Sequence, residues 1–196
     1  MIINLVRHPK AGGNVIKGRE DVPPDHGWEE STIELGERLL SFGPIDAVLT
    51  SNLRRARLPA EKLVVYFKDK GRAVDLVVSE LFIERDVGYF SGMTFEEFDR
   101  LYPGKHPHEH IFGLDEIPDG EPIVKVYERI NLARARYFDP HVSSGGRLVV
   151  SGHGWWINHC MNDMTQVKKP YNKIPNLGVV VLEYDGKIAR ELPFKK

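Results

Sequence analysis

The stretch MIINLVRHPK (residues 1–10) contains a short apolar run that leads directly into Arg7 and His8. This run is too short and too rich in β-branched residues for a helix, so it predicts a buried strand. A second histidine, His153, ends a similar run in LVVSGHG (residues 148–154). Open α/β sheets bind ligands outside the carboxyl ends of their strands, and both histidines are expected there.

Length, composition and charge limit the classes of protein to which the chain can belong. With 196 residues, 41% of them hydrophobic, and a net charge of −1, we expect one domain over residues 1–196. Nucleic-acid-binding proteins usually carry a basic excess, so we expect no nucleic-acid partner. The apolar runs are far shorter than the ~20 residues that span a bilayer, and the N-terminus has no basic leader. We therefore expect no membrane contact and a cytoplasmic location. The single cysteine, Cys160, fits a reducing compartment.

Apolar, β-branched runs alternate along the chain with segments whose apolar residues recur at helical spacing. The expected strands are 2–6, 47–50, 74–78, 148–151, 179–184 and 188–192. The expected helices are 31–41, about 53–67, 94–101, 122–137 and 156–164. Pro59 lies inside the second helix, which it either kinks or forces to start late. The alternation predicts an α/β fold, a three-layer α/β/α sandwich around a mostly parallel central sheet.

The segment from about residue 80 to 122 interrupts this alternation. It is polar and rich in proline, and it contains one helix signal, a capping box formed by Thr94 and Glu97. Insertions of this length in an α/β domain are usually lids or binding loops. We therefore expect a lid insertion at about 80–122.

Three histidines alternate within this insertion, at His106, His108 and His110. On a regular strand they could bind a metal from one face, but Pro107 between them disfavours a strand. We therefore expect a solvated lid loop there, with one histidine near the substrate, and no metal site. The sequence also contains no phosphate-loop or dinucleotide-binding motif, so no cofactor is expected.

An arginine and a histidine at the end of one strand suit phosphate chemistry. A neutral His8 imidazole could act as a nucleophile toward phosphorus, provided that a backbone carbonyl holds the proton on Nδ1 and leaves Nε2 free. The Arg7 guanidinium stays charged and can bind phosphate oxygens in fork geometry. A phosphomonoester dianion needs several such groups, so further cations are expected nearby.

Four segments, in this order, resemble motifs of the histidine phosphatase superfamily, also called the phosphoglycerate mutase-like family. They are LVRHP (5–9), SNLRRA (51–56), ERDVG (84–88) followed by Gly92, and VSGHG (150–154). They are similar, respectively, to the family's Arg-His-Gly signature, its Ser-x-Leu-x-Arg-Ala segment, a Glu-x-x-x-Gly stretch and its second histidine motif. The resemblance covers nearly the whole chain and implies a phosphoglycerate mutase-like fold.

The resemblance also implies roles for individual residues. His8 would be the nucleophile that is transiently phosphorylated, and Glu84 would be the general acid and base, with Glu80 and Asp86 as reserve candidates. The residues expected to bind the phosphate or the rest of the substrate are Arg7, Asn14, Arg55, His153, Gly154 and Trp155. Backbone N–H groups at the start of the helix after His153 are expected to add to the phosphate site.

Two positions depart from the family's pattern. Pro9 stands where the family has glycine, and it lacks an N–H but keeps its carbonyl. Leu58 and Pro59 stand where the family usually has Gln-Thr, so any polar contacts of those two residues are absent.

These features predict a metal-independent phosphatase that hydrolyses a phosphomonoester through a phosphohistidine on His8. Two alternatives remain open: phosphoglycerate mutase-type phosphoryl transfer, and a diverged, non-catalytic protein that binds a phospho-ligand. The expected partner is a small phosphorylated metabolite or a phosphate ion, and the sequence leaves a homodimer open.

Overall fold

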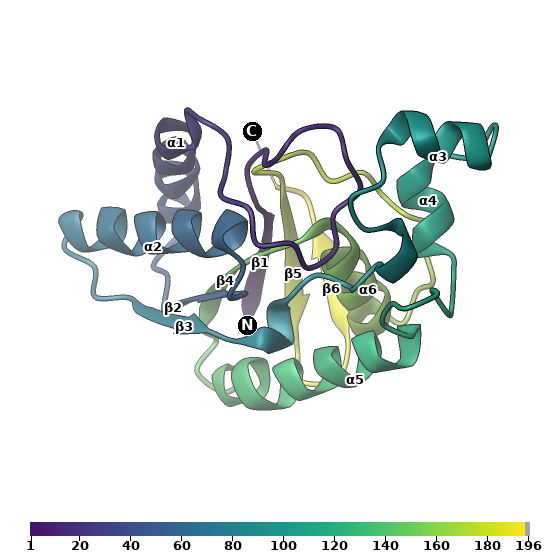
Figure 1. Cartoon of the computed structure of the whole chain (residues 1–196). Helices are drawn as coiled ribbons and strands as arrows, with labels where there is room; N and C mark the ends of the chain where they lie inside the picture. The colour runs from purple at the N-terminus through teal and green to yellow at the C-terminus, as the bar shows by residue number, and fades with distance from the viewer. Residues whose placement is uncertain (195–196) are drawn as a thin grey trace.

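A mixed, mostly parallel sheet forms the centre of the protein (Figure 1). The structure is a computed structural model that describes residues 1–194. Within these residues the strands are β1 (Ile2–Arg7), β2 (Ala47–Thr50), β3 (Asp75–Val78), β4 (Arg147–Gly152), β5 (Val179–Tyr184) and β6 (Ala189–Leu192). They lie in the order β3-β2-β4-β1-β5-β6, in which the β1–β5 and β5–β6 pairs are antiparallel and the other pairs are parallel. Each strand agrees with its expected range to within one residue, and the predicted fold class is confirmed.

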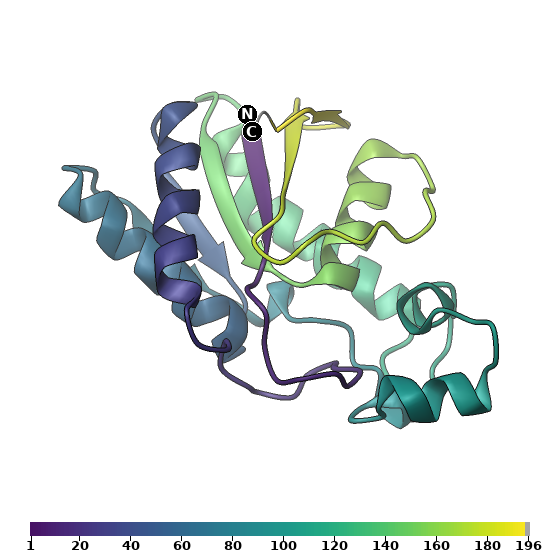
Figure 2. The ribbon, with the colours of Figure 1, turned by 90° about the horizontal axis from the view of Figure 1, so that it is seen from above.

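Helices cover both faces of the sheet and give the three layers that Figure 2 shows from above. The helices α1 (Trp28–Ser41) and α2 (Arg54–Asp69) pack on one face, and α5 (Ile123–Ala133) and α6 (Gly154–Thr165) pack on the other. Successive side chains of a strand point to opposite faces. The central strands β1, β2 and β4 are therefore buried on both sides, which is why they read as largely apolar runs.

Helix boundaries differ from the expected ones mainly at the ends. The helix α2 runs from Arg54 through Pro59 without a late start. Pro59 lies in its second turn, where only the Arg55 carbonyl loses its helical partner. Pro122 precedes the first residue of α5, and the expected helix 122–137 changes after Ala133 into a π-helical turn (Arg134–Phe138).

The insertion at 80–122 folds into short helical segments. Two 3₁₀ turns, Glu80–Phe82 and Gly88–Phe90, are followed by α3 (Phe95–Leu101) and α4 (Pro107–Phe112). The expected capping box at the start of α3 is present. The expectation of a loop around His106–His110 is wrong, because these residues form α4, in which Pro107 takes the first helical position, where its missing N–H costs nothing.

The insertion lies against the loop that follows β1. Val15 and Thr94 form an isolated antiparallel bridge, and Ile16 exchanges backbone hydrogen bonds with Gly92 and Met93. A separate apolar cluster beneath them joins the two segments to α6; it consists of Ile16, Val87, Phe90, Phe98, Ile111, Ile117 and Trp155. The insertion therefore stands beside the carboxyl ends of β1 and β4.

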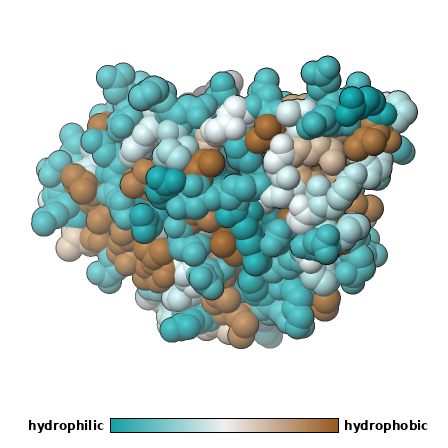
Figure 3. Space-filling model, viewed as in Figure 1, coloured by the Kyte–Doolittle hydropathy of each residue, from teal (hydrophilic) through white to brown (hydrophobic). Residues whose placement is uncertain are grey.

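The surface is largely hydrophilic in the view of Figure 3, with one apolar area over β3 and the adjoining part of α2. Val65 and Val78 are among the large apolar side chains that remain exposed. No helix within residues 1–194 is long and apolar enough to cross a membrane.

Candidate active site

The two histidines meet because β1 and β4 are neighbouring parallel strands. Their register pairs Arg7 with Gly152, so His8 and His153 leave the sheet side by side. The His8 backbone N–H donates to the Gly152 carbonyl at 3.0 Å, and the centroids of the two imidazole rings are 5.2 Å apart. His153 is fully buried, whereas His8 lines a cavity at the end of the sheet.

A backbone carbonyl fixes the proton of the His8 imidazole. Nδ1 lies 2.6 Å from the Pro9 carbonyl oxygen, so Nδ1 carries the hydrogen and donates it. Nε2 keeps its lone pair as a result. Burial, and after it the charge of Arg55, lowers the pKa of His8 well below its usual 6.5, so the ring is neutral near neutral pH. Pro9 therefore supplies the one backbone group that this arrangement requires.

Two guanidinium groups line the same cavity as His8. Arg55, the second residue of α2, is 1% exposed and donates to the carbonyls of Glu20 and Gly18 at 2.5 and 2.7 Å. Arg7 donates through Nη1 to a carbonyl at 2.6 Å. The Nε of each arginine is buried and has no hydrogen-bond partner within residues 1–194. Arginines that are held by carbonyls and still have free donors are suited to bind an anion.

Glu84 lies in an irregular segment between the two 3₁₀ turns and is 4% exposed. Its Oε1 accepts the backbone N–H groups of Arg85 and Trp156, both at 2.9 Å, and its Oε2 accepts that of Trp155 at 3.1 Å. Burial raises the pKa of Glu84 above its usual 4.5, although these N–H groups and Arg55 oppose the rise. A carboxyl of this kind can carry a proton closer to neutral pH.

The contacts of Glu84 also correct an expectation about the start of α6. The N–H groups of Trp155 and Trp156 bind the Glu84 carboxylate, so they are not available to a phosphate. The positive end of the helix dipole thus acts on the carboxylate.

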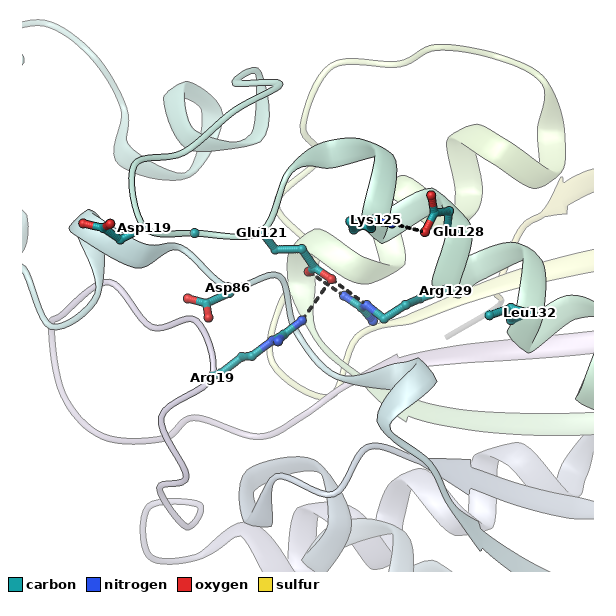
Figure 4. A pocket seen from close by; sticks show the side chains of 9 residues that line it. Arg19, Asp86, Asp119, Glu121, Lys125, Glu128, Arg129 and Leu132 are labelled. Carbon is teal, nitrogen blue, oxygen red and sulfur yellow. Dashed lines mark hydrogen bonds and ion pairs between the residues drawn. The ribbon is translucent and has the colours of Figure 1, made fainter.

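Figure 4 shows an ion-pair network formed by Arg19, Glu121 and Arg129, and this network holds the backbone around Glu84. Arg129 Nη1 donates at 3.1 and 3.0 Å to two carbonyls just before Glu84, and Arg19 Nε donates at 3.3 Å to the Glu84 carbonyl. Glu121 pairs with both arginines, at 2.8 Å from Arg129 and 2.9 Å from Arg19. Burial alone would raise the pKa of Glu121, but the hydrogen bonds and charge of Arg129 hold it below 4.5. Glu121 is therefore an ionised bridge between the two arginines.

The cavity beside His8 has a volume of about 290 Å³. The expected site residues in its lining are Arg7, His8, Asn14, Arg55, Glu84, Gly154 and Trp155. His153 is not in the lining, but its ring is next to that of His8. The polar and aromatic lining residues that the sequence did not reveal are Lys10, Lys17, Phe95, Tyr171, Lys173 and Asn176. The insertion supplies Phe95, which its position as a lid could have indicated, whereas no motif marks the segment 171–176.

Of the three alternating histidines, His108 alone lines this cavity. Burial lowers the pKa of His108 to about 4. The centroid of its ring is 5.3 Å from that of Trp155 and 5.8 Å from that of Tyr171. Within residues 1–194 no group of three or more His, Cys, Asp or Glu side chains is arranged to hold a metal ion.

Several other residues with reactive side chains lie away from the cavity. Glu80 and Asp86, the reserve acids, are not in its lining. Cys160 is fully buried in the core and hydrogen bonds to the Met164 sulfur, and burial raises the pKa of its thiol. Among the neighbouring aromatic residues, Trp155 lines the cavity, whereas Phe82, Phe90 and Trp156 are core residues and Tyr89 is exposed.

Comparison with protein families matches residues 3–192 to the histidine phosphatase superfamily, branch 1. An uncharacterized phosphatase, PhoE, from Bacillus subtilis (strain 168) is 31% identical over 118 residues, which cover 59% of this chain and 58% of the relative. A probable phosphoglycerate mutase, GpmB, from Salmonella arizonae is 26% identical over 157 residues, which cover 78% of this chain and 69% of the relative. The match thus spans little more than half the length of the Bacillus protein.

Solved structures show the same fold. A mycobacterial glucosyl-3-phosphoglycerate phosphatase in complex with VO₃ superposes with a TM-score of 0.77 at 20% identity, over 97% of this chain and 96% of that one. The same phosphatase with inorganic phosphate gives a TM-score of 0.78 at 20% identity, over 98% of this chain and 95% of that one. A phosphoglycerate mutase from Bacillus anthracis gives a TM-score of 0.77 at 18% identity, over 97% of this chain and 91% of that one. Because the family match covers nearly the whole chain, the protein belongs to the histidine phosphatase superfamily, branch 1.

Proposed function

We propose that this protein is a metal-independent phosphatase that hydrolyses the phosphomonoester of a small metabolite through a phosphohistidine on His8. The observation that carries the proposal is the 2.6 Å contact between His8 Nδ1 and the Pro9 carbonyl, in a cavity shared with Arg7 and Arg55. This contact leaves Nε2 as a neutral nucleophile beside two fixed cations. The pair of cations supports binding of a dianionic phosphoryl group.

In the first step, His8 Nε2 attacks phosphorus and the bond between phosphorus and the ester oxygen breaks. Positive and donor groups around the phosphoryl oxygens stabilise the charge in the transition state, a role that we assign to Arg7, Arg55 and His153. The leaving oxygen takes a proton from Glu84. Oε2 is the better carrier of this proton, because it accepts one backbone hydrogen bond whereas Oε1 accepts two.

In the second step, the ionised Glu84 accepts a proton from a water molecule whose oxygen attacks the phosphoryl group on His8. The phosphorus–nitrogen bond breaks, inorganic phosphate leaves, and both neutral His8 and protonated Glu84 are restored. The three backbone N–H groups stabilise the carboxylate that exists between the two steps, while burial favours the protonated form at the start. These opposing effects suit a group that both donates and accepts a proton.

Hydrolysis is favoured over mutase transfer by the exposure of the outer wall of the cavity. Lys10, Gly13 and Asn14 line the cavity and are exposed. Water can therefore reach a phosphohistidine, whereas a mutase has to keep water away from it. A mutase would return the phosphoryl group to a second position of the substrate, so release of free phosphate separates the two activities.

Rapid quenching at alkaline pH tests the intermediate directly. An aryl phosphate labelled in its phosphoryl group should leave an acid-labile label on His8, and His8→Ala should remove it. A label on Cys160 or on a serine would overturn the mechanism. A protein that binds phosphate but releases none from any aryl or alkyl phosphate would instead be a non-catalytic binding protein.

A chelator tests the part of the proposal that concerns metals. Phosphate release should persist in EDTA, because the cations that we assign to the phosphoryl group are Arg7 and Arg55. Loss of activity on chelation, with recovery on adding a divalent cation, would contradict the metal-independent reaction.

A further inference from the structure

Ser51 is a fully buried residue that the reaction described above does not use. It follows directly after β2, and the β2–β4 register, which pairs Thr50 with Ser151, brings it close to the end of β4. Its Oγ lies 2.7 Å from Nε2 of His153. Neither Ser51 nor His153 lines the cavity beside His8, but the centroid of the His153 ring is 5.2 Å from that of His8, which does. Ser51 can therefore act on a ligand bound at His8 only through His153.

The hydrogen bonds of the Ser51 hydroxyl show which way this contact runs. A serine hydroxyl donates one hydrogen and accepts with two lone pairs. The Leu53 backbone N–H already donates to Oγ at 3.2 Å. If Nε2–H of His153 also donated to Oγ, the hydroxyl hydrogen would need another acceptor, and Oγ has no third partner within residues 1–194. Because buried polar groups are nearly always paired, Ser51 donates to Nε2.

A hydroxyl that donates to Nε2 places the proton of His153 on Nδ1. Burial, followed by the charge of Arg55, lowers the pKa of His153 well below 6.5, so near neutral pH the ring is neutral and carries one hydrogen. Nδ1 is buried and has no hydrogen-bond partner within the described part of the chain. One ring nitrogen is thus bound to Ser51, and the other carries a hydrogen that no described residue accepts.

We propose that Ser51 is a positioning residue that sets the tautomer of His153, so that this histidine offers Nδ1–H to the phosphoryl group at His8. With the opposite tautomer, His153 would turn a lone pair toward an anion, which is repulsive. The hydrogen bond made by one ring nitrogen commonly decides the state of the other. This inference rests on the proposed function in one respect, namely that the anion is a phosphoryl group.

The wild-type protein alone provides the first test. Two-bond ¹H–¹⁵N correlation spectra distinguish a protonated ring nitrogen from a bare one, and they require neither substrate nor turnover. We expect His153 to be protonated on Nδ1 and bare on Nε2. A ring protonated on Nε2 would mean that Ser51 accepts, and the proposal would be wrong.

The second test compares Ser51→Ala with Ser151→Ala. Both variants remove a buried serine hydroxyl, but Ser151 Oγ donates to the Ala56 carbonyl and does not touch His153. Ser51→Ala should lose the fixed Nδ1–H pattern and weaken inorganic phosphate binding about tenfold, equivalent to about 1.4 kcal/mol. Ser151→Ala should keep both. Unchanged phosphate affinity and an unchanged tautomer in Ser51→Ala would refute the proposal.

Kinetics then separate this inference from the proposed function. Ser51→Ala should lower kcat/KM by the same factor for alkyl and nitrophenyl phosphates, because both carry the same phosphoryl group. If the tautomer and the phosphate affinity behave as expected but no phosphoester is hydrolysed and no phosphohistidine forms, the proposed activity fails while the role of Ser51 stands.

Discussion

The histidine pair and Glu84 lie in one site but are positioned in different ways. His8 and His153 directly follow two paired strands, so the sheet register places them. Glu84 lies outside every strand and α-helix, between two 3₁₀ turns. Its position depends on side chains that are distant in sequence, with Arg19 65 residues away from it and Glu121 linking Arg19 to Arg129.

This difference predicts different responses to mutation. A sheet register is maintained by many backbone hydrogen bonds, so a change in one neighbouring side chain leaves the histidines in place. The backbone around Glu84 is held by few side chains, and removing one of them is expected to displace it. Substituting a residue that binds the phosphoryl group should also lower kcat/KM by the same factor for all substrates. Substituting Glu84 should instead lower kcat/KM most for substrates with a poor leaving group.

The largest effect is expected for Glu84→Gln with a poor leaving group. An alkoxide needs a proton as it departs, so kcat/KM for alkyl phosphates should fall by roughly 10²–10⁴-fold, the usual range for general acid–base catalysis. Nitrophenolate leaves largely without help, so the loss for nitrophenyl phosphate should be much smaller. The comparison uses kcat/KM because this parameter reports steps through the phosphorylation of His8 and not the later hydrolysis.

Equal losses on the two substrates would show that another group is the acid. The position of Glu80 and Asp86 outside the cavity lining makes them poor replacements. Such a result would therefore point to a water molecule or to the substrate itself as the proton donor.

Arg55→Ala should give the next largest effect, and it should not depend on the leaving group. Arg55 is buried, and two carbonyls hold its guanidinium in a fixed position. Removal of one preorganised donor typically costs roughly 10²–10³-fold in rate. We expect a loss of this order in kcat/KM for both alkyl and nitrophenyl phosphates. A loss confined to one substrate would place Arg55 on the leaving group instead.

The same difference explains what could be predicted from the sequence. The strands are short apolar runs with clear ends, so residues that follow them, such as His8 and His153, could be placed at one edge of the sheet. The fixed His8 tautomer was also expected, because it needs only a neighbouring carbonyl. These features depend on local sequence and on the general rules of parallel sheets.

The rest depends on tertiary contacts that leave no local pattern. Glu121 is one acid among 28 in the sequence, and nothing near it indicates that it joins Arg19 to Arg129. The helix α4 was missed because its proline and histidines resemble a loop, and its buried Ile111 packs in a cluster formed by distant segments. The Ser51 hydroxyl also reaches His153 across 102 residues of sequence.

Glu121→Gln tests the network around Glu84 and should have a smaller effect than either change above. Breaking a buried ion pair typically lowers the free energy of unfolding by about 3–5 kcal/mol. For Glu121→Gln we expect a loss of about 2 kcal/mol, because Arg19 is more than a third exposed and glutamine keeps one acceptor. The displaced Glu84 should lower kcat/KM for alkyl phosphates roughly tenfold and for nitrophenyl phosphate less.

Glu128→Gln is the matched control, because Glu128 is also an ion-paired glutamate in the region of Figure 4. Its partner, Lys125, and Glu128 itself are both more than half exposed, so stability should change by under about 0.5 kcal/mol. Urea unfolding and the two-substrate kinetics measure both variants. If Glu121→Gln loses stability but affects the two substrates equally, the network supports the fold without positioning Glu84.

The dependence of stability on pH should show the smallest difference between the two parts of the site. Burial lowers the pKa of His153, so as pH falls through about 6.5 the unfolded chain binds a proton that the folded protein does not, and stability decreases. Glu84 has a raised pKa, so above about 4.5 the folded protein keeps a proton that the unfolded chain releases. Its contribution to stability therefore decreases as pH rises toward its folded pKa.

Urea unfolding at about pH 7.5 and about pH 6 measures the two contributions, since one buried neutral histidine accounts for roughly 0.8 kcal/mol between these values. The wild-type protein should be more stable at the higher pH, and His153→Gln should reduce the difference by about this amount. Glu84→Gln should leave the difference unchanged or increase it, because it removes a contribution of opposite sign. A pH difference that is the same in His153→Gln and in the wild type would mean that folded His153 takes up a proton as readily as the unfolded chain. In that case its ring would carry two hydrogens at pH 6, and Ser51 would have no tautomer to select there.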